Sequence, residues 1–178
     1  KIHNVTTVWG WSGTALSPNH PALIGLGNGI GGAGQAYNTH RPLELQFFIV
    51  LMQDWKALPN ERQRALVSDP WVFAEWIDAR DGADRRQLRH MLLHLLFPDT
   101  FERVSSPNHK AQIDAAFSHL LNATSLAANE MATTPIARDR RLLRIRSALE
   151  RDQPNEKLDF YIGDVYRRWL PEPAAAEP

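Results

Sequence analysis

Hydrophobic positions after residue 41 recur every three or four residues, which is the spacing of one face of an α-helix. Two predicted helices begin at Asp69-Pro70 and Ser106-Pro107, where a side-chain oxygen can cap free amides and proline fits the first turn. Asp84 is expected to cap another, which ends before Pro98. The predicted helices cover 43–57, 60–67, a segment from 70, 84–97, a segment from 107, and 136–150, followed by a short aromatic segment at 160–170. The sequence therefore predicts an all-α, multi-helix bundle over residues 42–170.

The first forty-one residues differ in composition from the rest of the chain. They are rich in Gly, Asn, Thr and Pro, and the first carboxylate in the chain is Glu44. This composition predicts irregular structure. Residues 1–41 are therefore expected to form a loop-rich, Gly-rich wrap with short strands at Val5–Trp9 and Ala22–Leu26. Residues 171–178 are rich in Pro, Ala and Glu and are expected to form a flexible tail.

Composition narrows the cellular context. The chain has 178 residues, of which 43% are hydrophobic, so it can bury a core as one domain or as two small subdomains. Its longest apolar run, Phe47–Met52, is too short to span a bilayer, and no secretory signal pattern opens the chain. It contains no cysteine, which excludes disulfides and thiolate chemistry. These features predict a cytoplasmic protein without a membrane partner.

Three patterns resemble chemical sites, and each has a simpler interpretation. The run Gly27–Gly32 fits a dinucleotide-binding turn, but no good helix start follows it, so we interpret it as a surface loop. His90 and His94 have the spacing of a metal pair but lack a third ligand, and we interpret them as polar-face residues. Their helix is expected to pack through an apolar stripe formed by Leu88, Met91, Leu92, Leu95 and Leu96.

The third pattern is a turn flanked by Asp99, Glu102 and His109, which could serve as general acids or bases. Charge-assisted hydrogen bonds to Arg103 and Lys110 explain these residues more simply. The sequence therefore predicts no enzyme activity, no cofactor and no metal for this chain.

Arginine is the most informative residue type. The chain has sixteen arginines and four lysines, and six of the arginines lie between residues 138 and 151. On a helix, Arg140, Arg144 and Arg151 fall opposite the apolar face, and Arg141 and Arg146 flank them. This strip is either a solvated face paired with nearby acids or a contact surface for phosphates or an acidic partner. The net charge of zero weighs against a purely electrostatic nucleic-acid binder.

The segment from 94 to 110, here the corner block, carries a family resemblance. Its sequence His94-Leu-Leu-Phe-Pro-Asp-Thr-Phe-Glu-Arg103, followed by Ser105-Ser-Pro-Asn-His-Lys110, resembles a block in McrB-like AAA+ proteins of modification-dependent restriction systems. Supporting pieces in the same order are residues 37–44, 55–58, 69–73 and 158–161. On its own residues, the block predicts a rigid corner in which Phe101 packs back on a helix end. His109 and Lys110 would occupy the exposed first turns of the next helix, where they could touch phosphate.

The resemblance implies a parent protein that is a nucleotide-driven motor of microbial immunity and works with a separate nuclease subunit. Its N-terminal regions would recognise modified DNA or another cue. Residues 1–178 contain no Walker loop, so the resemblance implies that they form an accessory domain and that the AAA+ motor domain lies elsewhere in the same parent chain. The predicted function is DNA recognition, with modified DNA as one target. The predicted contact residues are Arg140, Arg141, Arg144, Arg146, Arg151, His109 and Lys110. The alternative is a docking module for the motor, the nuclease subunit or a phage-derived trigger.

Overall fold

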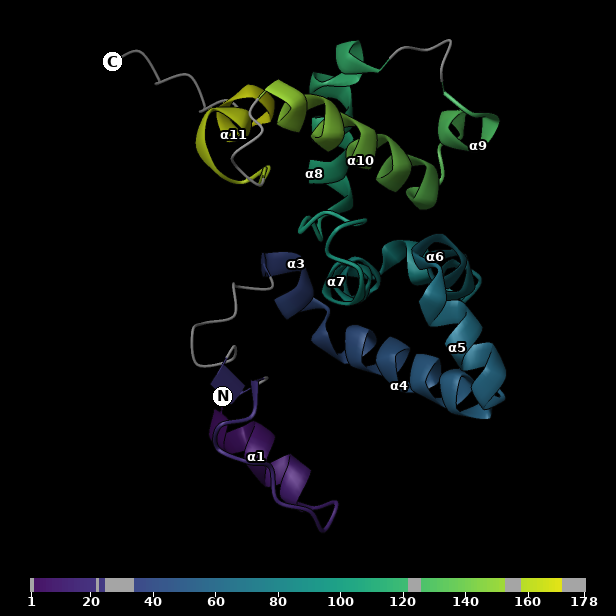
Figure 1. Ribbon diagram of the computed structural model, residues 1–178, viewed down its shortest axis with the longest axis vertical. Helices are drawn as coiled ribbons and strands as arrows, with labels where there is room; N and C mark the ends of the chain where they lie inside the picture. The colour runs from purple at the N-terminus through teal and green to yellow at the C-terminus, as the bar shows by residue number, and fades with distance from the viewer. Residues whose placement is uncertain (1, 22, 25–33, 122–125, 153–157, 171–178) are drawn as a thin grey trace. The chain divides into compact units, whose positions relative to one another are not determined.

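The structure is a computed structural model, and it describes residues 2–21, 23–24, 34–121, 126–152 and 158–170. The chain divides into two compact units, Lys1–Gly34 and Gln35–Pro178. Within the described residues, every regular element is a helix, which confirms the all-α prediction (Figure 1). No helix in this described part is long and apolar enough to cross a bilayer.

In the first unit, α1 spans Ile2–Gly10, so the strand predicted at Val5–Trp9 is wrong. Both threonine hydroxyls find acceptors within the helix, because Thr6 Oγ1 donates to His3 O at 2.9 Å and Thr7 Oγ1 to His3 O at 2.8 Å. The apolar residues of α1 also recur at helical spacing. The second predicted strand lies mostly outside the described residues, and so does the glycine run at 27–32.

The next helix, α3 (Gly34–Thr39), begins at the last residue of the first unit. The second unit continues with α4 (Arg41–Ala57), α5 (Asn60–Ser68), α6 (Pro70–Asp78), η1 (Ala83–Arg85), α7 (Gln87–Leu96), α8 (Pro107–Ala116), η2 (Ser118–Leu120), α9 (Ala128–Met131), α10 (Pro135–Asp152) and α11 (Gly163–Trp169). Both predicted Asp/Ser-Pro starts are confirmed. Asp69 Oδ1 accepts from Trp71 N at 2.8 Å, and Ser106 Oγ accepts from His109 N at 3.3 Å.

The start of α7 differs from the prediction. Asp84 lies in the short η1 turn, and α7 begins three residues later. Its free amides are capped by a carboxylate from another helix, because Glu44 of α4 accepts from Gln87 N at 3.2 Å and from Leu88 N at 2.9 Å. Glu44 is buried, and the positive end of α7 stabilises its charge. This bond fixes α4 against the start of α7.

Two hydrophobic clusters form the core of the second unit. The first consists of Phe47, Leu51, Leu66, Phe73, Ala74, Ile77, Ala83, Leu93 and Phe101. The second consists of Val104, Ile113, Phe117, Leu142, Ile145, Leu149, Phe160 and Trp169. The corner block connects them, because Phe101 belongs to the first and Val104 to the second. The Phe101 ring lies 6.4 Å from Phe97 and 5.0 Å from Trp71, so the packing predicted for Phe101 is confirmed.

Candidate functional site

A buried network of charged side chains joins α6, α7, α8 and α10. The carboxylate of Asp139 accepts from Arg89 Nη1 at 2.6 Å and from Lys110 Nζ at 2.5 Å. Arg89 also donates through Nε and Nη2 to Asp78, at 2.7 and 3.0 Å. Arg89, Lys110 and Asp139 are all buried. Each of these charges therefore has a partner of opposite sign, as charges removed from water require.

Electrostatics within the network favour one set of protonation states. Burial raises the pKa of Asp139, but Lys110 and Arg89 outweigh burial and hold that pKa at about 2. Nδ1 of His90 lies 2.9 Å from Arg89 Nη1 and 3.0 Å from Lys110 Nζ. Both cations can only donate, so His90 Nδ1 accepts and its ring is neutral. Burial and Lys110 accordingly lower the pKa of His90 well below its usual value.

This network corrects the interpretation of α7. The polar residues Arg89 and His90 face inward with Leu93, while Leu95, predicted to be part of the packing stripe, is 74% exposed. His94 is also not on a free polar face, because its Nδ1 lies 2.8 Å from Phe101 O and donates to that carbonyl. Arg89 and His90 can be buried because α6, α8 and α10 supply their hydrogen-bond partners. Among the described residues, no cluster of three or more His, Asp or Glu side chains is arranged to hold a metal.

Arg146 connects α10 to the corner block. It is buried, its Nε lies 3.3 Å from Glu102 Oε1, and its Nη1 and Nη2 donate to the carbonyls of Pro98 and Asp99. Burial raises the pKa of Glu102 to about 7, and the nearby Arg146 counteracts only part of this shift. The corner predicted from sequence is therefore held by an arginine 47 residues further along the chain.

Arg141 is also engaged inside the fold. Its guanidinium donates to Asp114 at 2.6 Å through Nη2, and its Nη1 donates to Glu130 O at 2.5 Å and to Ala132 O at 3.1 Å. These bonds tie α10 to α8 and α9. Arg144 donates from Nε to Glu130 Oε1 at 2.6 Å but keeps an exposed side chain.

The remaining predicted contact residues also divide into residues that are engaged within the fold and residues that are exposed. Arg140 stacks on Trp71, with its Cζ 4.1 Å from the ring centroid. His109 Nδ1 lies 2.9 Å from the hydroxyl of Tyr161. Arg151 is exposed. Lys110 is buried, so the prediction that it is exposed on the first turns of α8 is wrong. Of the seven residues proposed as contacts, Arg144 and Arg151 are exposed, Arg146 and Lys110 are buried, and the other three are half-buried.

Sequence reasoning missed the outer face of α4, defined here as Leu45, Phe48 and Ile49. These side chains are 57%, 37% and 49% exposed, whereas Phe47 and Leu51 on the inner face are buried. The spacing i, i+3, i+4 places the three exposed residues in one stripe. A signal was present in the sequence, because α4 carries apolar residues on more sides than one packed face needs.

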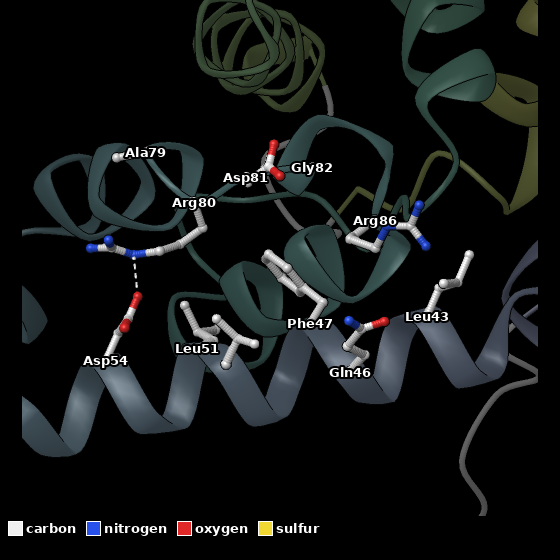
Figure 2. Close-up of a pocket in the computed structure, with 11 residues that line it drawn as sticks. Leu43, Gln46, Phe47, Leu51, Asp54, Ala79, Arg80, Asp81, Gly82 and Arg86 are labelled. Atoms are coloured by element: carbon white, nitrogen blue, oxygen red, sulfur yellow. Dashed lines mark ion pairs between the residues drawn. The ribbon is translucent and has the colours of Figure 1, made fainter.

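A pocket of about 450 Å³ lies between α4 and the segment 79–86. In Figure 2, Phe47 and Leu51 project from α4 toward that segment, and a dashed line marks the ion pair of Arg80 with Asp54. The Arg80 Nε to Asp54 Oδ2 distance is 3.2 Å. Arg86 also lines the pocket, so two guanidinium groups, the carboxylates of Asp54 and Asp81 and the amide of Gln46 lie along it beside the apolar side chains.

The corner block, which carries the McrB-like resemblance, is thus a structural corner. The candidates for a binding surface that face outward are the outer face of α4, the pocket, and Arg144 and Arg151 of α10. Comparison with protein-family models, with curated proteins and with solved structures finds no match to this chain.

Proposed function

We propose that this chain is a protein-docking accessory domain of an McrB-like defence motor, and that the outer face of α4 is its docking surface. The observation that carries the proposal is the exposed stripe of Leu45, Phe48 and Ile49. A contiguous apolar stripe on a helix is a surface that a partner's amphipathic helix can cover. The proposal assigns no catalysis to this chain.

Charge at the ends of this stripe indicates the chemistry of the partner. Arg41 and Lys56 are exposed at the two ends of α4. The acids of α4 are engaged elsewhere, because Glu44 caps α7 and Asp54 pairs with Arg80. The docking surface is therefore apolar with cationic ends. Its partner would be an amphipathic helix with carboxylates beside its apolar face, since complementary charge steers association and fixes register. The resemblance nominates the AAA+ motor or the nuclease subunit as the source of that helix.

The arginines of α10 support docking over direct DNA recognition. Arg141 and Arg146 have their donors engaged with acids and carbonyls of the same fold, so a phosphate would have to displace those partners. Arg144 and Arg151 remain exposed, and this is the one observation that favours nucleic acid as a second candidate. A cationic pair can contribute to phosphate binding, but a salt-dependent affinity of useful size needs several such contacts.

The test measures binding of this chain to three purified probes: the parent's AAA+ motor domain, the companion nuclease subunit, and duplex DNA with and without modified bases. We expect saturable binding to one of the proteins, weakened at least about thirtyfold by Phe48→Lys, because central interface residues contribute about 2 kcal/mol or more. Val67→Lys is the matched control, since Val67 is 44% exposed on α5. It should leave the affinity unchanged.

Two outcomes would overturn the docking proposal. One is the absence of binding to both proteins. The other is salt-sensitive DNA binding that Arg144→Glu and Arg151→Glu abolish and Phe48→Lys leaves intact. The latter result would transfer the function to the arginine face of α10.

A further inference from the structure

The helix α1 of the first unit carries an apolar face that the docking proposal does not use. Val5, Val8 and Trp9 follow the i, i+3, i+4 spacing of one helix face, and they are 40%, 56% and 49% exposed. Together with Ser12 they line a hollow of about 600 Å³. Contiguous exposed apolar faces commonly mark interaction sites, so the question is what covers this one.

Trp11 lies directly beside the hollow. It follows the last residue of α1 in a turn, where Trp11 N donates to Val8 O at 3.2 Å and Ser12 N donates to Trp9 O at 2.9 Å. The Trp11 side chain is 78% exposed and does not line the hollow. The first unit therefore has a protruding indole and an apolar hollow next to each other. A surface with both features can pair with an identical surface through a two-fold axis.

The polar groups of this face indicate the kind of partner it fits. Lys1 is the only Asp, Glu, Lys or Arg residue before Arg41. The hydroxyls beside the hollow are already bonded, because Ser12 Oγ donates to Trp9 O at 2.6 Å and lies 2.8 Å from Thr14 Oγ1. The described face therefore offers a charged partner no carboxylate, ammonium or guanidinium group to pair with. Two copies of it can meet without like-charge repulsion and without leaving these hydroxyls unbonded.

The first unit also has little core of its own. It runs from Lys1 to Gly34, and among its described residues Leu23, at 4% exposure, is the one buried hydrophobic side chain. Units shorter than about 40 residues usually gain stability from disulfides, metals or association, and the chain contains no cysteine. Covering the α1 face with a second copy would supply apolar burial that the first unit lacks.

We propose that the first unit mediates self-association, in which two copies of this chain pair through the apolar face of α1. Trp11 of each copy enters the hollow of the other, between Val8 and Trp9. The surface consists of one nine-residue helix and a turn, which is small beside the roughly 800 Å² per partner of stable interfaces, so the association is weak. This surface is separate from the outer face of α4 and does not depend on the docking proposal.

Sedimentation equilibrium of the whole 178-residue chain tests the proposal. We expect a monomer–dimer equilibrium with a dissociation constant of roughly 10–100 μM. Val8→Lys places a charge in the hollow and Trp11→Ser removes the indole, so each should weaken association about tenfold or more. Both side chains are more than half exposed, so both variants should keep the helical circular dichroism of the wild type.

Fluorine NMR of protein labelled with 5-fluorotryptophan follows Trp11 itself. Its resonance, identified by its loss in Trp11→Phe, should shift with protein concentration as the indole enters the partner copy. Leu95→Lys is the matched control, because Leu95 is 74% exposed on α7 of the second unit. It should leave the dissociation constant unchanged. Phe48→Lys, on the outer face of α4, should also leave it unchanged.

Four results would overturn the proposal. They are a chain that stays monomeric up to about 1 mM, a dimer that neither Val8→Lys nor Trp11→Ser weakens, a Trp11 resonance that does not shift with concentration, and a dimer that Phe48→Lys abolishes. The last result would assign the pairing to α4 instead of α1.

Discussion

The two longest helices of the second unit, α4 and α10, differ from what their sequences suggest. The α4 helix spans 17 residues and is rich in apolar side chains, yet Leu45 and Ile49 are exposed to solvent. The α10 helix spans 18 residues and is rich in arginine, yet Arg146 and Asp139 are buried. The difference shows that residue type alone does not decide burial. A charged side chain is buried where the fold provides partners, and an apolar one is exposed where nothing in the fold covers it.

The partners of the α10 arginines come from elements that are distant in sequence. Asp114 in α8 accepts from Arg141, Glu130 in α9 accepts from Arg144, and the corner block supplies acceptors for Arg146. Arginine is suited to this role because its five donors can satisfy several acceptors at once. The arginine face of α10 is therefore largely a means of holding neighbouring helices in place.

The largest expected effect comes from the centre of the buried network. Asp139→Ala leaves Arg89 and Lys110 buried without their shared carboxylate, and we expect it to lower the free energy of unfolding by about 3–5 kcal/mol. Urea denaturation followed by circular dichroism measures this change. Asp164→Ala is the control, because the Asp164 side chain is 87% exposed and should change stability little. A loss below about 1 kcal/mol for Asp139→Ala would show that the network does not hold α7, α8 and α10 together.

The next effect separates two arginines of one helix. Arg146→Gln removes the bonds to the carbonyls of Pro98 and Asp99 and the ion pair with Glu102, so it should cost about 2–3 kcal/mol. Arg151→Gln, at an exposed position of the same helix, should change stability by less than about 0.5 kcal/mol. Equal losses for both variants in urea denaturation would contradict the division of α10 into structural and exposed arginines.

Two helix starts were predictable because their signals are local. Asp69-Pro70 and Ser106-Pro107 place the cap and the first turn within three residues of each other. The cap on α7 was not predictable, because Glu44 lies 44 residues from Leu88. The buried charge network was harder still to predict, since Arg89 and Asp139 are 50 residues apart. Each of the two looks solvent-exposed when its own helix is considered alone. Long-range pairing of charges has no periodic signature.

A smaller effect, which depends on pH, tests the role of Glu102 in the corner block. Burial raises the pKa of Glu102 from 4.5 to about 7. The folded state therefore binds a proton more tightly than the unfolded state. The resulting stability is fully present below pH 4.5 and is lost as the pH rises through about 7. The contribution is at most about 3.5 kcal/mol, because the pKa rises from 4.5 to about 7 and one pKa unit corresponds to about 1.4 kcal/mol.

Glu102→Gln should reduce the change in the free energy of unfolding between pH 6.5 and 8. Thermal or urea unfolding of both proteins across this range measures the difference. Titration of His90 has the opposite sign, because its pKa is lowered in the fold and its contribution is lost as the pH falls. The range above 6.5 therefore isolates Glu102 from His90. Identical slopes for the two proteins would show that Glu102 is ionised throughout and held by Arg146.

The smallest expected effect lies on α4. Ile49→Lys places a charge at a position that is 49% exposed and should change the free energy of unfolding by less than about 0.5 kcal/mol. Leu51→Ala, two residues away on the buried face, should cost about 2–5 kcal/mol in the same urea experiment. If Ile49→Lys destabilised the protein by more than about 1.5 kcal/mol, its side chain would be packed within the folded chain. The outer face of α4 would then be part of the core, and it could not bind a partner helix.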